Sequence, residues 1–348
     1  MLELVMMIPG VVGPRKGFSL IADNPYGSVM IWWLSFLIIP VVLGLLWTLW
    51  KKPRWRILAG LLMVPALFGF YARFIEPHRL VIAEHTVRIC GEGLPGTLTA
   101  AVVSDMHSGL YSNSPSISRI VRTLNNQAPD FVLMPGDFTN FLAEKHMDRA
   151  MAPFMDLDMP AYAVLGNHDF GLPGHDVEER LQTALEKSGV TVLNPGSATF
   201  GAHGKYVRIV GMQDFYELKE NRPDFSPDHG VSPLPTILLE HNPDLIKTGR
   251  TGPFDLFVAG HTHGGQILLP FITCTMTFAC DTLRYGYEET PAGKLFVTSG
   301  TGMSGVPLRF GVPPKIDMVT MEIDRCRVDA IRNPMLAPNL PLNSPSMD

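Results

Sequence analysis

The chain has 348 residues, a formal net charge of −5 and a mean hydropathy of +0.15. This length is sufficient for one large domain or two, with ample material for a core. The acidic balance gives no electrostatic footprint for nucleic acid, so no nucleic-acid partner is expected and a nuclease is disfavoured. The positive hydropathy is high for a soluble protein, and the apolar excess lies near the N-terminus.

The N-terminal region contains a long uncharged run. Residues 1–27 mix apolar residues with Pro, Gly and a few charges, without the features of a secretory signal, and are expected to be interfacial or flexible. From Ser28 to Trp50 no residue is charged, and the run can cross a ~30 Å hydrocarbon core at ~1.5 Å per residue. Tryptophans, which favour membrane interfaces, lie near its two ends: Trp32, Trp33, Trp47 and Trp50.

A basic turn and a second apolar run follow. Residues 51–56 carry four positive charges in six positions, and residues 57–72 are apolar, about one residue short of the ~17–25 usual for a span. We expect residues 28–78 to form two transmembrane helices in the cell (inner) membrane, with the lipid bilayer as a partner. Basic turns favour the cytoplasm, which would place the rest of the chain outside. If residues 57–72 lie in the interface instead, the rest of the chain is cytoplasmic.

Residues 79–329 have the composition of a soluble α/β domain. Helical periodicity covers residues 114–127, with Ser114 as the expected cap, and residues 175–189. The number of short apolar runs favours two packed sheets flanked by helices over one parallel sheet. Residues 330–348 are rich in proline and are expected to be extended or disordered. The predicted strands are 80–89, 98–103, 131–134, 161–165, 190–193, 206–210, 235–239, 254–259, 294–297 and 316–323.

The four cysteines are scattered and form no C-x-x-C pair. We expect Cys90, Cys274, Cys280 and Cys326 to be buried thiols, with a Cys274–Cys280 disulfide as the alternative. The cellular compartment therefore does not follow from the cysteines.

Five turns of the α/β domain carry side chains typical of metal ligands, and each turn directly follows a predicted strand. Because strand ends in α/β folds gather at one edge of a sheet, side chains far apart in sequence can meet there. Each turn alone is also an ordinary turn or capping sequence; the set of five in one domain favours a common site. The turns are Ser104–His107, Gly136–Asn140, Gly166–Asp169, Glu240–Pro243 and Gly260–Gln266.

The residue types favour transition-metal ions. Imidazole, carboxylate and amide groups suit such ions, and the absence of cysteine from all five turns disfavours a purely structural zinc site. Two cations ~3.5–4 Å apart repel one another, so an anionic group must bridge them. A carboxylate such as that of Asp137 suits this task, as does a hydroxide.

The pattern D-x-H, G-D-x-x-N, G-N-H-D, H and G-H-T-H resembles the calcineurin-like metallophosphoesterase superfamily over about residues 80–325. The sequence G-H-T-H-G-G-Q and residues 302–310, G-M-S-G-V-P-L-R-F, resemble a bacterial membrane-associated branch. That branch includes phosphodiesterases and UDP-2,3-diacylglucosamine pyrophosphatases. The resemblance implies an α/β class fold, a four-layer α/β/β/α sandwich, here preceded by the transmembrane hairpin.

The resemblance also implies two divalent metal ions (Mn, Fe or Zn) and a role for each matched residue. One metal would be held by Asp105, His107 and His263, and the other by Asn167, His241 and His261. Asp137 would bridge the two. His168 would protonate the leaving oxygen or stabilise charge on the phosphoryl group, and the nucleophile would be a metal-bound hydroxide.

One position departs from the family pattern. Many relatives have Asp where this chain has Asn140, and that Asp orients the catalytic histidine and raises its basicity. Asn140 carries no charge, so His168 is expected to be the weaker base unless Asp169 or another acid substitutes. Asn140 and Asp169 are therefore included among the candidate catalytic residues.

Two further features concern the substrate. Residues 267–280 are unusually apolar for a segment that leaves an active-site turn. They are interpreted either as a buried strand and loop or as a lipid-facing wall. Arg309 is a candidate phosphate contact, with a surface salt bridge as the alternative.

The sequence thus predicts a membrane-anchored, two-metal enzyme that hydrolyses a phosphodiester or pyrophosphate of an amphiphilic, lipid-linked or nucleotide-lipid substrate. The alternatives are a non-catalytic membrane protein stabilised by metal and a phosphodiesterase of soluble nucleotides or nucleic acid.

Overall fold

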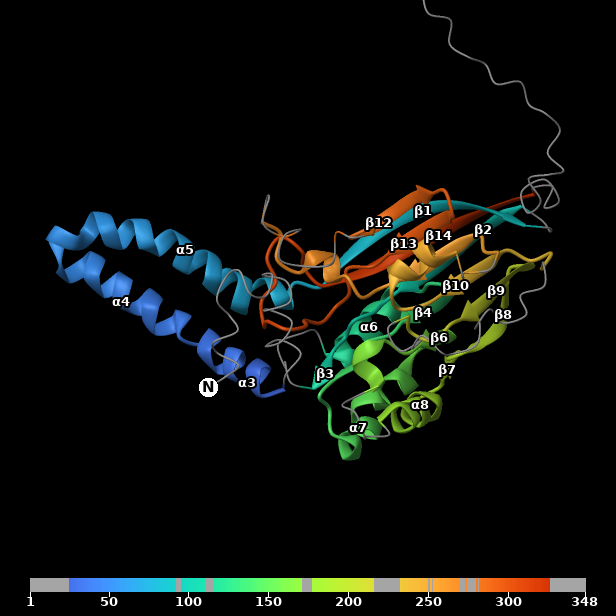
Figure 1. Cartoon of the computed structure of the whole chain (residues 1–348), viewed down its shortest axis with the longest axis horizontal. Coiled ribbons are helices and arrows are strands. Elements are labelled where there is room, and N and C mark those ends of the chain that lie inside the picture. Colours follow the sequence, from blue (N-terminus) through green and yellow to red (C-terminus); the bar gives the residue numbers. More distant parts are fainter. Residues whose placement is uncertain are drawn as a thin grey trace, which may run out of the picture.

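The protein consists of a helical hairpin and an α/β domain, and Figure 1 shows the hairpin extending away from the domain. This computed structural model describes residues 25–91, 95–109, 116–170, 177–215, 232–249, 251, 253–269, 273, 280 and 282–325. The predicted segments 1–27 and 330–348 lie almost wholly or wholly outside this range, as do Ser114, Cys274 and Cys326.

The hairpin contains three α-helices: α3 (Pro25–Ser35), α4 (Ile38–Lys51) and α5 (Arg56–Phe74). Pro40 explains the break between α3 and α4, because proline lacks an N–H and its ring clashes with the carbonyl four residues earlier. The break places Pro40 in the first turn of α4, where it is tolerated. The antiparallel helices approach closely, since a Cβ at Gly69 of α5 would lie 3.3 Å from Ile38 Cδ1 of α4.

By length and composition, two segments of the hairpin could cross a membrane: Tyr26–Lys51 and Pro53–His78. Their large apolar side chains point outward, as at Trp50, Leu61 and Phe68, which are 71%, 68% and 53% exposed. Trp50 and Leu61 remain largely exposed among the described residues, whereas the ring of Phe68 contacts that of Phe310.

The first sheet of the domain has six strands in the order β1-β14-β2-β4-β6-β7. Strands β2, β4, β6 and β7 run parallel, so their carboxyl ends share one edge. Strand β14 is parallel to β1 and antiparallel to β2. The bounds are β1 (Val81–Gly91), β14 (Lys315–Arg325), β2 (Gly96–Val102), β4 (Phe131–Pro135), β6 (Ala161–Val164) and β7 (Val190–Val192).

The second sheet also has six strands, in the order β12-β13-β11-β10-β9-β8. Its four central strands are parallel, whereas both edge strands are antiparallel to their neighbours. A small parallel pair joins β3 (Ser108–Gly109) to β5 (Thr139–Asn140). The bounds of the six strands are β12 (Gly286–Thr290), β13 (Gly293–Val297), β11 (Leu256–Ala259), β10 (Thr236–Leu239), β9 (Lys205–Gly211) and β8 (Gly196–Ala202).

The two sheets pack face to face through a core of aliphatic and aromatic side chains, among them Val102, Leu133, Val164, Ile209, Leu239 and Val258. The outer face of the first sheet is covered by α6 (Ile117–Gln127), α7 (Met147–Met151) and α8 (Val177–Lys187). Over the second sheet, the described residues include the short helix η6 (Pro243–Thr248), whose Leu245 and Ile246 pack on its outer face.

The predicted fold class is confirmed: two packed sheets carry helices on their outer faces and follow two apolar helical segments near the N-terminus. The cap of α6 is Ser116, whose side chain accepts a hydrogen bond from Arg119 N. The expectation of buried thiols is wrong for the two described cysteines, because Cys90 and Cys280 are both disulfide-bonded. Strands β8 and β12 were not predicted, since both are largely exposed and rich in glycine or polar residues.

Candidate metal centre

Every predicted ligand follows a strand that ends at the same region of the two sheets. Asp105 and His107 follow β2, Asp137 follows β4, and Asn167 follows β6 in the first sheet. His241 follows β10, and the pair His261 and His263 follows β11, in the second. Because β2, β4 and β6 are parallel, as are β10 and β11, their carboxyl ends bring these turns together.

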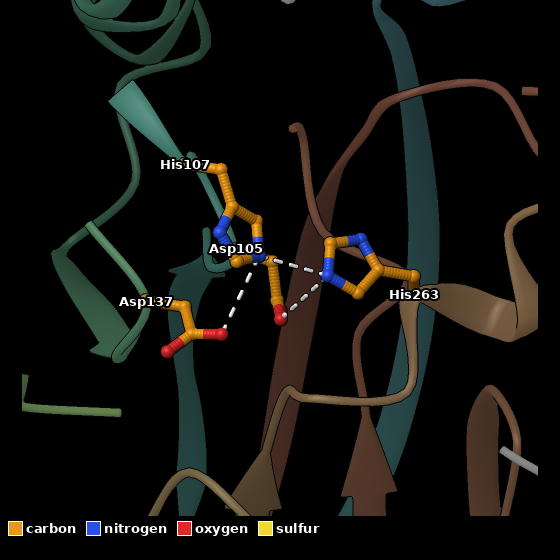
Figure 2. A group of neighbouring side chains, drawn as sticks. All are labelled: Asp105, His107, Asp137 and His263. Carbon is orange, nitrogen blue, oxygen red and sulfur yellow. Dashed lines mark hydrogen bonds and ion pairs between the residues drawn. The ribbon is translucent and has the colours of Figure 1, made fainter. Parts of the chain in front are cut away.

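Four of these side chains form a buried cluster in which the candidate ligand atoms lie within 4.8 Å of one another. Figure 2 shows Asp105, His107, Asp137 and His263 turned toward each other. His107 Nε2 lies 2.9 Å from His263 Nε2 and 3.4 Å from Asp137 Oδ2. His263 Nε2 lies 3.4 Å from Asp105 Oδ1. Two imidazole nitrogens and two carboxylates at this separation are a donor set that suits a divalent transition metal.

The remaining three ligand candidates form a second group next to the first. His261 Nδ1 lies 3.0 Å from Asn167 Oδ1 and 3.2 Å from His241 Nε2. His241 Nδ1 donates to the carbonyl of Pro135 at 2.7 Å, which leaves Nε2 directed inward. A carbonyl on the outer nitrogen of a histidine is the usual way to orient a metal ligand.

Asp137 joins the two groups. Its Oδ2 lies 3.4 Å from His107 Nε2 of the first group and 3.2 Å from His241 Nε2 of the second. The other oxygen, Oδ1, accepts a hydrogen bond from the backbone N–H of His168 at 3.0 Å. One carboxylate thus contacts both groups and fixes the turn that carries the candidate acid.

The backbone of the centre is strained at the ligands themselves. Five of them have positive φ values between 47° and 68°, a region that non-glycine residues enter at a cost. Such conformations persist where surrounding contacts enforce them, and they are concentrated at functional sites. The five residues are Asp105, His107, Asp137, His261 and His263.

Glycines permit the close approach of the turns. A Cβ at Gly166 would lie 2.3 Å from Asp137 Oδ1, and one at Gly260 would lie 2.6 Å from Asp105 Oδ2. Any larger residue at either position would displace a candidate ligand.

Three of the four histidines among the candidate ligands are neutral in this environment. Burial lowers the pKa of His107 and the pKa of His261 to about 3. Burial also lowers the pKa of His263 well below its usual value. Neutral imidazole is the form that binds cations, so these residues fit a metal without first losing a proton.

Asp137 and His241 behave as an ion pair. Burial opposes both charges, but the carboxylate of Asp137 raises the pKa of His241 well above its usual value. In turn, the neighbouring His241, His168 and His107 lower the pKa of Asp137 despite its burial. A cation bound here would take the place of the proton on His241.

His168 lies beside the cluster and is partly exposed, unlike the four clustered side chains, which are buried. Its ring stands edge-on to that of His107, with 4.9 Å between centroids, and its Nε2 lies 3.4 Å from Ser304 Oγ. Gln266 holds the turn that carries Ser304, because its side chain donates to the carbonyls of Ser304 and Val306 and accepts from Ser304 N. Neither Ser304 nor Gln266 was predicted from the sequence to belong to the site, although both lie in the family motifs G-H-T-H-G-G-Q and G-M-S-G-V-P-L-R-F.

Asn140 and Asp169 were predicted to act on His168, but no hydrogen bond joins either side chain to His168 among the described residues. Asn140 is buried, and its Oδ1 has no hydrogen-bond partner there. The carboxylate of Asp169 accepts from three backbone N–H groups, those of Phe138, Thr139 and Gly166. Asp169 therefore ties the Asp137 turn to the Asn167 turn and does not serve as a substitute acid.

Arg309 does not have the surroundings of a phosphate contact. It is fully buried, and its guanidinium donates to the carbonyls of Gly302, Val312, Ser299 and Gly300. These bonds occupy the planar fork that a phosphate would need. A surface salt bridge, the alternative, is also incompatible with this burial. The apolar stretch 267–280 is described at residues 267–269, 273 and 280, and the rest of it lies outside the described residues.

Comparison with known proteins agrees with this geometry. The sequence model of the calcineurin-like phosphoesterase family matches residues 98–265, a range that contains all seven candidate ligands. The uncharacterized metallophosphoesterase YkuE of Bacillus subtilis is 31% identical over 275 residues, which cover 76% of this chain and 93% of that protein. The phosphodiesterase YaeI of Escherichia coli is 26% identical over 259 residues, covering 73% of this chain and 92% of its own.

A more distant likeness is structural. The NAD nucleotidase NadN of Haemophilus influenzae aligns with a TM-score of 0.39 and 16% identity over 60% of this chain and 46% of that one, too distant to support an inference. The similarity to YkuE spans nearly that whole protein, and the matched region carries the metal cluster. The chain therefore belongs to the calcineurin-like metallophosphoesterase family and is a metal-dependent phosphoesterase, a hydrolase.

Proposed function

We propose that this protein is a membrane-anchored phosphoesterase with two metal ions that hydrolyses a phosphodiester or pyrophosphate of a lipid-linked or nucleotide-lipid substrate. The proposal of two metal ions is based on the position of Asp137. Its Oδ2 lies within 3.4 Å of a histidine nitrogen from each of the two ligand groups. A shared carboxylate is what two adjacent cations require, since it offsets their repulsion.

Asp105, His107 and His263 would hold one ion, and Asn167, His241 and His261 the other, with Asp137 between them. When bound, divalent cations supply charge stabilisation to a phosphoryl group and lower the pKa of water. Mn, Fe and Zn all suit these nitrogen and oxygen ligands.

His168 is the proposed general acid. The hydrogen bond from its backbone N–H to Asp137 Oδ1 fixes it relative to the proposed bridge. Its partly exposed ring can reach a bound substrate. From this position it would give its Nε2 proton to the leaving oxygen, and Ser304 Oγ, 3.4 Å away, would help to orient the ring.

Two observations support an anchored domain outside the cytoplasm. The hairpin exposes apolar side chains along both helices, and Lys51 Nζ lies 3.8 Å from the Trp50 ring centroid at its basic turn, a pairing that suits a membrane interface. Cys90 and Cys280 are disulfide-bonded, and disulfides persist in oxidising compartments. A compartment reporter fused after residue 340 tests this orientation, and activity of a reporter that works only in the cytoplasm would contradict it.

The anchor also supports the substrate class. An enzyme held at the bilayer meets amphiphilic molecules at a high local concentration. The name of the E. coli relative, a phosphodiesterase, favours a diester bond. A domain outside the cytoplasm would argue against UDP-diacylglucosamine, which is made in the cytoplasm.

The test is hydrolysis of bis(p-nitrophenyl) phosphate by the full-length protein in detergent with added Mn²⁺. We expect activity that falls by about 10²–10⁴-fold in His168→Ala, the range of general acid catalysis, while bound metal is retained. Asp137→Asn should lose both activity and metal. His146→Ala, an exposed histidine outside the site, is the matched control.

Metal binding without hydrolysis of any diester or pyrophosphate would favour a non-catalytic protein. Equal rates on soluble nucleotides and on lipid-linked substrates in vesicles would contradict the amphiphilic substrate. Strong cleavage of single-stranded DNA would indicate a nuclease.

A further inference from the structure

The segment Gly302–Phe310 lies between the hairpin and the metal cluster and contacts both. At the hairpin, the backbone N–H of Arg309 donates to the carbonyl of Ala72 in α5 at 3.0 Å. The ring of Phe310 stands edge-on to those of Phe68 and Tyr71, with centroids 5.5 Å and 6.4 Å apart. The end of α5 is therefore docked on this segment by one backbone bond and two aromatic contacts.

The guanidinium of Arg309 organises the inner part of the segment. Nε donates to Gly302 O at 2.8 Å, Nη1 to Val312 O at 2.9 Å, and Nη2 to Ser299 O at 3.0 Å. The side chain is fully buried, and burial lowers its pKa to about 10, which leaves it charged at neutral pH. A buried cation with this many carbonyl partners fixes the backbone around it.

That backbone touches the metal cluster at two points. The N–H groups of Thr301 and Gly302 donate to the carbonyls of Ser104 and Asp105, at 2.9 Å and 2.6 Å. Arg309 Nη2 also lies 3.4 Å from His263 Nδ1, the ring nitrogen that is not the candidate ligand atom. Of the four clustered ligands, Asp105 is thus contacted by Gly302, which Arg309 holds, and His263 is contacted by Arg309 itself.

We propose that helix α5 is a structural part of the metal centre and that Arg309 and Phe310 are the positioning residues that connect them. The hairpin would then do more than hold the enzyme at the membrane. Its docking would set the geometry of Asp105 and His263, and loosening it would weaken metal binding. This proposal rests on the buried cluster and not on the proposed substrate.

The experiment measures Mn²⁺ affinity and metal content of the full-length protein in detergent for Phe68→Ala, Phe310→Ala and the double variant. Residues that orient metal ligands contribute ~10–100-fold to affinity, and we expect about tenfold weaker binding for each single variant. The double variant should be no worse than Phe310→Ala alone, which already removes the contacts of that ring with both Phe68 and Tyr71. Phe310→Tyr, which keeps the ring, should restore affinity.

Two controls separate this effect from general damage. Leu61→Ala removes an exposed side chain of α5 far from the contact and should leave affinity unchanged. Val207→Ala, in the core between the sheets, should lower stability without changing metal affinity. Arg309→Lys keeps the charge but loses the fork, and we expect it to bind metal less tightly than the Phe310 variants.

Unchanged Mn²⁺ affinity in Phe68→Ala and Phe310→Ala would overturn the proposal, and so would fully additive losses in the double variant. If Arg309→Lys does not fold, the two phenylalanine variants still decide the question. Because the readout is metal affinity, a protein that binds Mn²⁺ but hydrolyses no phosphoester would contradict the proposed function and leave this inference standing.

Discussion

The hairpin and the metal centre depart from ordinary burial in opposite directions. In the hairpin, large apolar side chains such as Trp33 and Leu61 are 68% exposed, whereas in the domain the acids Asp105 and Asp169 are fully buried. Each arrangement is unfavourable in water unless something else compensates: lipid for the apolar surface, and a cation or hydrogen bonds for the buried charge. The apolar surface of the hairpin and the buried acids of the metal centre are thus the two places where the bare chain is least favourable in water, and Arg309 contacts both regions.

The largest effect is expected from metal removal. Burial raises the pKa of Asp105 to about 6 and, with the charge of Asp137, raises the pKa of Asp169 to about 7. In the unfolded chain these carboxyls release their protons near pH ~4. Between about pH 4 and pH 7 they therefore hold more protons in the metal-free folded state than in the unfolded state. The contribution of these two carboxyls to the stability of the metal-free protein is therefore fully present below that window and is lost as pH rises through it.

Bound metal should offset this loss. At a free concentration 100 times its dissociation constant, a ligand stabilises by about 2.7 kcal/mol, or roughly 5–10 °C in a domain of this size. Thermal unfolding with Mn²⁺ and with a chelator, at pH 5 and pH 8, measures the difference, which should be larger at pH 8. An equal difference at both pH values would show that the buried acids are not what the metal compensates.

The second effect concerns a buried carboxyl group that hydrogen bonds within the chain hold in place. Asp169→Asn keeps the size of the side chain but turns an amide N–H₂ toward backbone donors that now bond a carboxylate oxygen. An unsatisfied buried donor costs about 1–3 kcal/mol, so we expect a loss of that order in chemical unfolding. Asp156→Asn, at an exposed position, should change little. A neutral result at Asp169 would mean that the two turns hold together without it.

Much of this architecture could be predicted because the residue types are so constrained. Buried strands such as β4 and β11 are continuous apolar runs, and a ligand turn after each one follows from the topology of parallel sheets. The Gly260–Gln266 turn alone could have been a surface loop, and it was recognisable as part of a site only together with the four other ligand turns. The strands and turns that bring the ligands together were therefore the part of the structure that the sequence could predict.

What could not be predicted depends on contacts between distant segments. The sequence shows that Arg309 is cationic but not that carbonyls from residues 299 to 312 enclose it. Likewise, Asp169 follows a candidate acid in sequence, yet its carboxylate points to the neighbouring turn. Cysteine pairing and the docking of Phe310 on α5 have the same origin, since spacing along the chain does not determine proximity in space.

The smallest effect is expected from a substitution at Asn140, a buried polar residue that carries no charge. Strand β5, which carries Asn140, lies against the turn of His168, and Asn140 Oδ1 has no hydrogen-bond partner among the described residues. Asn140→Asp would add a carboxylate that favours the protonated form of His168. A change of one pKa unit corresponds to about a tenfold change in the protonation equilibrium. We therefore expect kcat to stay the same or to rise by up to about tenfold, with metal content unchanged. The pH–rate profile should move to higher pH with it, since the acid would keep its proton longer. A large loss of activity, or a profile that does not move, would mean that Asn140 has a role that a charge disrupts, such as direct contact with the substrate.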